Sequence, residues 1–377
     1  MSRCLLVIIV ILGIKAEAQS SALVKGDSLF ARGYYTKAIE AYISHENSKK
    51  TNAKVAKAYI ALANYDKALE YFEQQLKLLP NEELLMLDYA KLLSKLKQYE
   101  RASEVWHQLI DIDYKNPNYH YQAGLVLEFL KDSAAENRFY SAYQLDSTHQ
   151  KAIFKMAKIY LKKRNYYQVD YYVDKGLESY AYNKALISLK AQNYFLKKDY
   201  PNAAKWFEKL IARNESSLYI HEKLSFCYTR MSEFQNAIEQ CQLALKIEPT
   251  DVTNLYRLGV LYERVDDYQN AEKFILASLA LSDRALDNEY MKLGYVYNLQ
   301  GKHKDAIEAY TIATLENPEN EDAHFYVVLT KDRYYKDIEI RLKLYENYKK
   351  KFPKSKFIVM VDKRISELKE ENFLKRE

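Results

Sequence analysis

The chain has 377 residues, of which 48% are hydrophobic and 29% are charged, and its formal net charge is +6. Only 8 Gly and 6 Pro occur, so little of the chain can form long loops or β-hairpins, and an all-helical protein is expected. The small positive charge is spread over a long sequence and gives no reason to expect a nucleic acid as partner.

The first 18 residues have the pattern of a secretory signal peptide. Arg3 precedes the apolar run Leu5 to Ile14, which is followed by Ala16-Glu17-Ala18, matching the charged, apolar and small-residue regions of such a signal. An uncleaved membrane anchor is the alternative, but about ten apolar residues fall short of the roughly 20 that span a bilayer. Cys4 precedes the apolar run instead of closing it, which argues against a lipoprotein. We therefore expect cleavage after Ala18 and an exported protein, periplasmic in a Gram-negative source and otherwise secreted.

A small residue then recurs at intervals of 30 to 35 residues. A period near 34 is typical of helix-turn-helix repeats that stack into a solenoid with an extended concave surface. The pattern predicts one structural domain of about nine repeats over residues 19–353, because a solenoid grows by adding repeats rather than by enlarging one core. The recurrent positions are Ala38, Ala68, Ala102, Ala135, Val169, Ala203, Ala237, Ala271 and Ala306.

Two further sets of positions keep the same phase. A small residue stands twelve positions before each recurrent residue (eleven for Gly124), on the expected first helix, and a large residue stands four positions after it, on the expected second helix. We expect large to pack against small, so that the two helices interlock. The small set is Gly26, Ala56, Ala90, Gly124, Ala157, Ala191, Ser225, Gly259 and Gly294. The large set is Tyr42, Phe72, Trp106, Phe139, Val173, Phe207, Cys241, Ile275 and Tyr310.

These positions, an aromatic residue three before most of the recurrent ones, and prolines at the ends of repeats together resemble the tetratricopeptide repeat family. The repeat from Tyr290 to Pro318 matches the family pattern best, and the resemblance covers nearly all of residues 22 to 350. It implies a right-handed superhelix whose first helices line the groove. In this family the lining residues stand three before, one after and five after the small residue of the first helix.

The lining that the resemblance implies mixes aromatic and apolar side chains with basic ones. Such a surface suits a protein or peptide, with apolar anchors held by the aromatics and acidic groups held by the bases. Aromatic and basic surfaces also bind single-stranded nucleic acid, which export disfavours, and a saccharide is a further alternative. The candidate partner-binding residues are Tyr121, Leu125, Phe129, Phe154, Lys158, Lys162, Phe226, Arg230, Tyr256, Arg264, Met291 and Tyr295.

Some members of this family clamp the terminal carboxylate of chaperone tails with an Asn directly after the small residue. That position holds no Asn here, which argues against such a partner. The residues there are Lys57, Lys91, Leu125, Lys158, Gln192, Phe226, Val260 and Tyr295.

No pattern typical of catalysis or of a cofactor is present. The seven His residues form no i, i+4 pair, and the sequence contains no C-x-x-C, H-E-x-x-H or G-x-S-x-G motif. We expect neither enzyme activity nor a bound cofactor or metal. Cys227 and Cys241 would remain after cleavage. A disulfide between them is one possibility, but Cys241 occupies a packing position, which favours two buried free thiols.

The C-terminus departs from the repeat. Tyr334 to Phe352 is predicted to form a long basic helix that ends before Pro353, and residues 354–377 a capping helix with one apolar stripe. The stretch Tyr345 to Leu368 resembles the repeat ends of exported tetratricopeptide proteins of envelope assembly. The overall hypothesis is an exported, non-catalytic adaptor. The alternatives are a component of an envelope assembly or secretion machine, or a module that partners a separate enzyme chain. The stripe is Ile358, Val361, Ile365 and Leu368.

Overall fold

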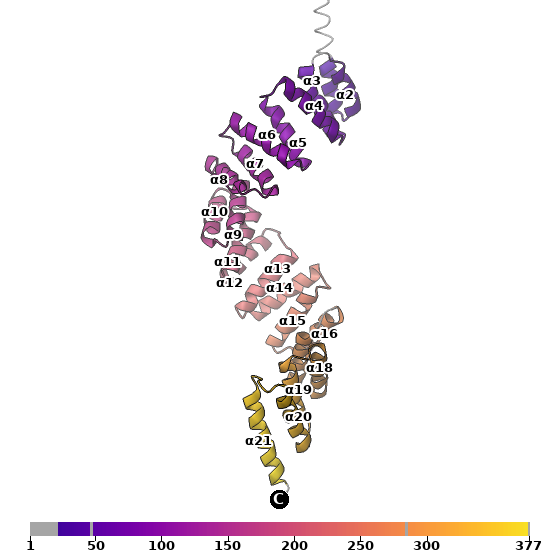
Figure 1. Cartoon of the computed structure of the whole chain (residues 1–377), viewed down its shortest axis with the longest axis vertical. Coiled ribbons are helices and arrows are strands. Elements are labelled where there is room, and N and C mark those ends of the chain that lie inside the picture. Colours follow the sequence, from indigo (N-terminus) through magenta and orange to yellow (C-terminus); the bar gives the residue numbers. More distant parts are fainter. Residues whose placement is uncertain (1–21, 46–47, 283–285, 376–377) are drawn as a thin grey trace, which may run out of the picture. The chain divides into compact units, whose positions relative to one another are not determined.

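The computed structural model describes residues 22–45, 48–282 and 286–375, and all the regular secondary structure in these ranges is helical (Figure 1). The predicted all-α class is therefore confirmed, whereas the predicted signal peptide, residues 1–18, lies outside the described residues. None of the helices in the described ranges combines the length and the hydrophobicity that a membrane span requires.

A helical segment over residues 22–31 comes first, and the helices that follow it pack in sequence against their neighbours from α2 to α10 and again from α12 to α21. They are α2 (Tyr35–Ile43), α3 (Ser48–Ala61), α4 (Tyr65–Leu78), α5 (Glu83–Lys95), α6 (Tyr99–Ile112), α7 (Pro117–Phe129), α8 (Ala134–Leu145), α9 (Gln150–Lys162), α10 (Tyr166–Ser179), α11 (Lys184–Leu196), α12 (Tyr200–Ile211), α13 (Leu218–Arg230), α14 (Phe234–Ile247), α15 (Val252–Arg264), α16 (Tyr268–Ala280), α17 (Asp287–Leu299), α18 (His303–Glu316), α19 (Glu321–Tyr334), α20 (Ile338–Lys351) and α21 (Ile358–Leu374).

The chain divides into two compact units. The N-terminal unit extends to Leu186 and the C-terminal unit begins at Ile187, so the division falls within α11. Within both units the same helical pair recurs, with the first helix and the second helix joined by a tight turn.

The recurrent small residues lie on the second helix of each repeat, as the period predicts. Eight of the nine are the fourth residue of their helix and are fully buried, while Ala135, the second residue of α8, is 8% exposed. The register of nine helical pairs, from residues 22–31 with α2 to α17 with α18, is therefore confirmed within the described residues.

The predicted packing of large against small side chains is also confirmed. A Cβ placed on Gly124 would lie 2.7 Å from the Phe139 ring, and one placed on Gly294 would lie 2.7 Å from the Tyr310 ring. Both aromatic side chains are buried, at 0% and 1% exposure. A larger residue at either glycine would displace the ring or separate the two helices, because the interior is close-packed.

The turn between the two helices of each repeat contains one residue in the left-handed region. The backbone N–H of the residue that follows it donates a hydrogen bond to a carbonyl near the end of the first helix. In one repeat, the N–H of Gln98, which follows Lys97, donates to the Leu93 carbonyl at 3.0 Å. Seven repeats hold a non-glycine residue there with φ between +56° and +62°, at a cost of about 1 kcal/mol each. The packing of the two helices therefore imposes the turn. The seven residues are Ala63, Lys97, Lys131, Arg164, Lys198, Ser232 and Asp266, and Gly33 and Gly301 occupy the other two turns.

The structure corrects the single helix predicted from Tyr334 to Phe352. Tyr334 ends α19, and α20 begins only at Ile338. Asp337 causes the break, because its carboxylate accepts the backbone N–H groups of Glu339 at 2.8 Å and Ile340 at 3.1 Å and so caps a new helix. The predicted end before Pro353 is confirmed, since α20 stops at Lys351.

The apolar stripe of the last helix packs as predicted. In α21, Val361 and Leu368 are fully buried and Ile365 is partly buried, all within a cluster that includes residues of α19 and α20. This cluster attaches α21 to the end of the C-terminal unit.

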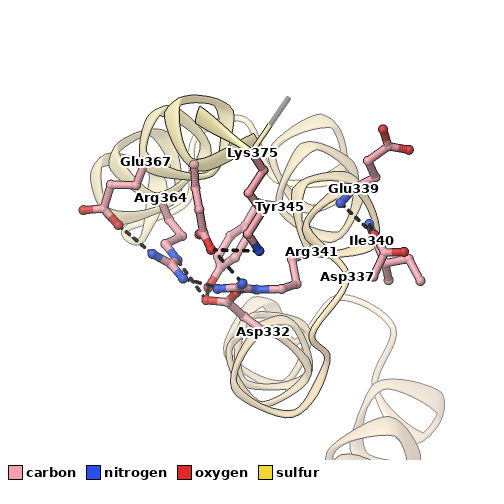
Figure 2. Close-up of polar contacts among 10 residues, drawn as sticks. Asp332, Asp337, Glu339, Ile340, Arg341, Tyr345, Arg364, Glu367 and Lys375 are labelled. Carbon is pink, nitrogen blue, oxygen red and sulfur yellow. Dashed lines mark hydrogen bonds and ion pairs between the residues drawn. The ribbon is translucent and has the colours of Figure 1, made fainter. Parts of the chain in front are cut away.

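A buried ionic cluster also joins these three helices (Figure 2). The Asp332 carboxylate, 8% exposed on α19, accepts hydrogen bonds from Arg341 Nε of α20 at 2.6 Å and Arg364 Nε of α21 at 2.9 Å. The Tyr345 hydroxyl donates to the same carboxylate at 3.1 Å. Burial by itself would raise the pKa of Asp332, but the hydrogen bonds from the two arginines outweigh it and hold that pKa below its usual value. These four residues are called the Asp332 cluster below.

Candidate partner-binding surface

The candidate residues lie on the first helices of the repeats, and the surface formed by their side chains is called the first-helix face. Six of them belong to the N-terminal unit and six to the C-terminal unit. Each set is therefore a surface of its own unit.

In the N-terminal unit, five of the six candidates are accessible and one is not. Phe129 is 62% exposed, Lys158 and Lys162 are exposed, and Leu125 and Phe154 are half-buried. Tyr121 is buried at 9% exposure, with its ring centroid 5.8 Å from that of Phe139 and 5.3 Å from that of His149.

The burial of Tyr121 therefore contradicts the prediction that its ring is accessible to a partner. Tyr121 fills space between α7 and α8 instead of offering a ring to a partner, and burial raises the pKa of its hydroxyl. The family position alone does not show whether a ring turns outward or inward.

A recurrent contact on this face was not predicted. Phe129 stacks on Tyr99 with ring centroids 4.7 Å apart, and Lys95 Nζ lies 4.7 Å from the Tyr65 centroid. In both pairs, the residue five after the small residue of one repeat meets the aromatic residue that begins the second helix of the preceding repeat. The aromatic residues that the sequence assigns to repeat structure thus also belong to the first-helix face.

A small cavity of about 210 Å³ opens on this face between α3 and α5. Lys57, Lys91 and Lys95 line it together with apolar side chains, and Lys57 forms an ion pair with Asp88 at 2.7 Å. Lys91 has no ion-pair partner among the described residues, and the same holds for Lys158 and Lys162.

In the C-terminal unit, Phe226 is the centre of an aromatic and cationic cluster. Its ring centroid lies 5.3 Å from that of Phe195 and 5.8 Å from that of Tyr200, and it remains 37% exposed. Lys223 Nζ lies 4.7 Å from the Phe195 centroid, and the Arg230 guanidinium carbon lies 5.6 Å from the Tyr200 centroid. These five residues are called the Phe226 cluster below.

The Phe226 cluster contains three residues that the repeat pattern did not indicate as partner-binding, namely Phe195, Tyr200 and Lys223. One signal could have indicated part of it. Arg230 follows Tyr200 by 30 residues, and the same separation joins Lys95 to Tyr65 and Phe129 to Tyr99. This spacing pairs the end of one first helix with the start of the preceding second helix.

The remaining candidates of the C-terminal unit surround a buried carboxylate. Glu263 is 8% exposed and pairs with Lys292 Nζ at 3.3 Å, while Arg264 Nε lies 3.9 Å away. Lys292 Nζ also lies 5.3 Å from the centroid of the half-exposed Tyr295 ring. Burial, together with the nearby carboxylates of Glu289 and Glu263, raises the pKa of Tyr256 to about 12. Tyr256, Glu263, Arg264, Lys292 and Tyr295 are called the Glu263 cluster, and Met291 is half-buried in the same helix as Tyr295.

The two clusters differ in their charge. Lys223 and Arg230 have no carboxylate partner among the described residues, and both are held over aromatic rings. The cations of the Glu263 cluster already face Glu263. The Phe226 cluster is therefore the part of the first-helix face of the C-terminal unit that best suits an acidic group of a partner.

Hollows also occur on the second-helix side of the N-terminal unit. A cavity of about 790 Å³ lies between α4 and α6, with Tyr89 and Arg101 in its wall. Another, of about 440 Å³, lies between α8 and α10 and is lined by five tyrosines. A test of the first-helix face therefore needs control substitutions on the second helices.

The His, Cys, Asp and Glu residues were also compared with the requirements of a metal site and of a reactive thiol. Within the described ranges, no group of three or more His, Cys, Asp and Glu residues is placed to hold a metal ion. Cys227 and Cys241 are buried free thiols, as predicted. Burial raises their pKa to about 12 and about 11, so neither is a reactive thiolate near neutral pH.

Pairs of helices that repeat about every 34 residues and interlock small against large side chains define a helical-repeat protein. Residues 51–127 match the family model described as Tetratricopeptide repeat protein 21 fourth ARM domain, and residues 255–289 match the model described as Tetratricopeptide repeat. The chain belongs to the tetratricopeptide repeat family. Proteins of this family generally act as scaffolds that bind proteins or peptides, and the fold is typically non-catalytic.

Relatives and a solved structure agree with this assignment. The chain is 22% identical over 329 residues to a TPR repeat-containing protein of Methanocaldococcus jannaschii, and the aligned region covers 68% of this chain and 58% of that protein. It is 30% identical over 120 residues to the general transcriptional corepressor trfA of Dictyostelium discoideum, and this aligned region covers 29% of this chain and 9% of that protein. The chain thus spans little more than half of the first relative and a small part of the second.

The C-terminal part of a TPR repeat-containing protein from Cytophaga hutchinsonii has the same fold. Its TM-score is 0.53 at 16% identity, over 64% of this chain and 98% of that one. The similarity is one of fold.

Proposed function

We propose that this protein is an exported, non-catalytic scaffold that binds an acidic and aromatic segment of a partner protein on its first-helix face. The observation that carries the proposal is the Phe226 cluster. It offers the accessible ring of Phe226 next to two cations that have no carboxylate partner among the described residues.

The geometry of this cluster supplies two complementary kinds of contact. Phe226 is accessible at its centre and can receive an apolar or aromatic anchor, the type of contact that dominates many interfaces. Lys223 and Arg230 lie at the edges, where the rings of Phe195 and Tyr200 fix their positions before a partner arrives. A partner carboxylate would meet preorganised cations, which lowers the entropy lost on binding.

The proposed location outside the cytoplasm is supported by the sequence of residues 1–18. Its apolar run Leu5 to Ile14 and the small residues Ala16 and Ala18 have the pattern of a cleavable signal. Intact-mass measurement of the exported form should show a chain that begins at Gln19. A mass that retains Met1 would contradict this part of the proposal.

A random peptide display library would test the partner class without knowledge of the natural partner. Selection on the purified protein should enrich peptides with Asp or Glu close to Phe, Tyr, Trp or Leu. Phe226→Ala and Arg230→Glu should each abolish that enrichment. Lys205→Glu is the matched control, because Lys205 is exposed on the second helix α12 and the change in charge is the same.

Two results would overturn the proposal. One is enrichment that survives both Phe226→Ala and Arg230→Glu in protein that remains folded by circular dichroism. The other is tight binding of a single-stranded oligonucleotide, measured by fluorescence anisotropy, that the same two substitutions abolish. The second result would replace the peptide by a nucleic acid, which aromatic and basic surfaces also bind.

A further inference from the structure

The outer face of α21 is not the polar surface expected at the end of a solenoid. Repeat proteins usually end in a helix whose exposed face is polar, because nothing stacks upon it. Here Val359 and Met360 are 76% and 58% exposed near the start of the helix, and Phe373 and Leu374 are both 63% exposed at its end. These side chains point away from the buried stripe of Val361 and Leu368.

The exposed residues of this face follow a helical seam. Val359, Lys363, Ser366, Glu370 and Phe373 succeed one another at steps of four and three residues, which places them along one side of the helix. Met360, Glu367 and Leu374 follow beside them at steps of seven. The seam therefore has apolar residues at both ends and charged residues between them.

The seam is complementary to itself when a second α21 lies antiparallel to the first. If the two-fold axis passes between Ser366 and Glu367, Val359 faces Leu374 of the second copy and Met360 faces Phe373 of the second copy. The same axis brings Lys363 opposite Glu370 of the second copy. Each contact occurs twice, as in any isologous interface.

We propose that α21 is a homodimerisation surface, in which two copies of this chain pair through antiparallel α21 helices. The charges favour this occupant. Lys363 is largely exposed and its partner within the described residues is Glu367, 4.0 Å away. Glu370 has no ion-pair partner among the described residues. A second copy supplies the opposite charge that Glu370 lacks and gives the exposed Lys363 a further carboxylate.

The ion pairs of the last helices prepare α21 for such a contact. Arg364 attaches it to Asp332 (Figure 2). Lys349 of α20 pairs with Asp362 at 2.6 Å, so the helix is held with its seam outward. One contact between helices of 17 residues is small compared with most stable interfaces. We therefore expect a weak dimer with a Kd of roughly 1–100 μM. The proposal does not depend on what binds the first-helix face.

Sedimentation equilibrium of the full chain, over protein concentrations that bracket this range, tests the proposal. The wild-type protein should show a monomer–dimer equilibrium. Lys363→Glu and Glu370→Lys should each weaken dimerisation by about tenfold or more, since each creates two like-charge contacts. Lys354→Glu is the matched control, because it makes the same change in net charge in the segment before α21, and it should leave the dimer unchanged.

Two rescues make the test specific for this pairing. The double variant Lys363→Glu/Glu370→Lys should dimerise as well as the wild-type protein. An equimolar mixture of the two single variants should form a heterodimer, because each copy then offers the opposite charge to the other. Phe373→Ser should weaken all of these dimers without a loss of helical circular dichroism, since the side chain is exposed in the monomer.

Several results would overturn the proposal. A wild-type protein that stays monomeric at all concentrations excludes the dimer. A dimer that neither single charge reversal weakens places the interface elsewhere. The antiparallel pairing of Lys363 with Glu370 is excluded if the mixture of the two single variants stays monomeric and the double variant stays monomeric as well.

Discussion

Two parts of the first-helix face in the C-terminal unit use the same repeat positions for different purposes. Lys223 and Lys292 both stand two residues before the small residue of their helix, and Arg230 and Arg264 both stand five residues after it. In the Phe226 cluster these cations lie over aromatic rings without a carboxylate, whereas in the Glu263 cluster they face a buried one.

One further position explains the difference. Four residues after the small residue, α11 has Phe195, whose ring lies next to Lys223, and α13 has Thr229, whose hydroxyl donates to the Ser225 carbonyl at 2.7 Å. The next repeat has Glu263 at that position. The count of basic residues therefore says little about capacity for an acidic partner, because an internal carboxylate can already satisfy them.

In the Asp332 cluster the cations are paired most completely with a carboxylate of the same chain. Two arginines and one tyrosine share a single buried carboxylate, and the group joins three helices instead of facing solvent. Similar ionic groups thus serve binding, local pairing and attachment of the last helix in one unit.

The largest expected effect is a loss of stability in Asp332→Asn. The substitution leaves two arginines close together without their carboxylate, and breaking such a buried pair typically costs about 3–5 kcal/mol in the free energy of unfolding. Urea unfolding of the variant followed by circular dichroism measures this loss. Asp337→Asn is the control, because Asn is also a good helix cap and the change should cost little. Equal losses in the two variants would contradict the role assigned to Asp332.

The same carboxylate predicts a pH dependence. The pKa of Asp332 is lower in the folded protein than its usual value, so the stabilisation is fully present above that usual value, about 4, and is lost as the pH falls through the folded pKa. The difference in stability between wild-type protein and Asp332→Asn should therefore shrink below about pH 4. A difference that stays constant on acidification would contradict this assignment.

The second effect separates binding from packing within α13. Phe226→Ala should weaken peptide binding by roughly 2 kcal/mol, since it removes the exposed anchor of the cluster. Tyr228→Ala, two residues away in a packed position, should instead cost about 3 kcal/mol of stability by leaving a cavity. Isothermal titration and urea unfolding measure the two quantities. A reversed order, with Phe226→Ala the less stable variant, would assign Phe226 to the core.

The third effect concerns association. Arg230→Glu should slow the association of an acidic peptide by about tenfold at low salt and reduce its dependence on salt, because long-range attraction is lost. Stopped-flow measurements at several salt concentrations report both quantities, and Lys205→Glu again serves as the control. The same reversal at Lys158 in the N-terminal unit should act on its own face in the same way. An unchanged salt dependence would show that Arg230 does not steer the partner.

The smallest effect is expected from substitutions that make the Glu263 cluster more like the Phe226 cluster, or the reverse. Glu263→Gln frees Lys292 and Arg264 and should increase the affinity for an acidic peptide by a few fold, at a cost of about 1 kcal/mol in stability. The reciprocal change, Thr229→Glu, should lower the affinity. If neither substitution alters affinity, the difference between the clusters does not come from the internal carboxylate.

Much of the fold could be predicted from the sequence, but less of the site. The positions of Ala38 to Ala306 follow from helical periodicity, and so does the match between Gly124 and Phe139. Tyr121 was wrong as an exposed anchor, because its family position does not determine the direction of its ring. Phe195, Tyr200 and Lys223 were missed, because the family pattern assigns groove residues one repeat at a time and these act across two. The single helix predicted from Tyr334 was wrong, because Asp337 caps a new helix after a break that periodicity does not show.

The sequence by itself determined the helical class, the number and register of the repeats, and which side chains interlock. These features depend on residues 3 to 16 positions apart, a distance that helix geometry and one tight turn convert directly into contacts. Only the tertiary structure decided which rings stay exposed, which cations find a carboxylate, and which face of α21 is left uncovered. Those outcomes depend on side chains from neighbouring repeats, about 30 residues apart, whose burial and pairing no local period specifies.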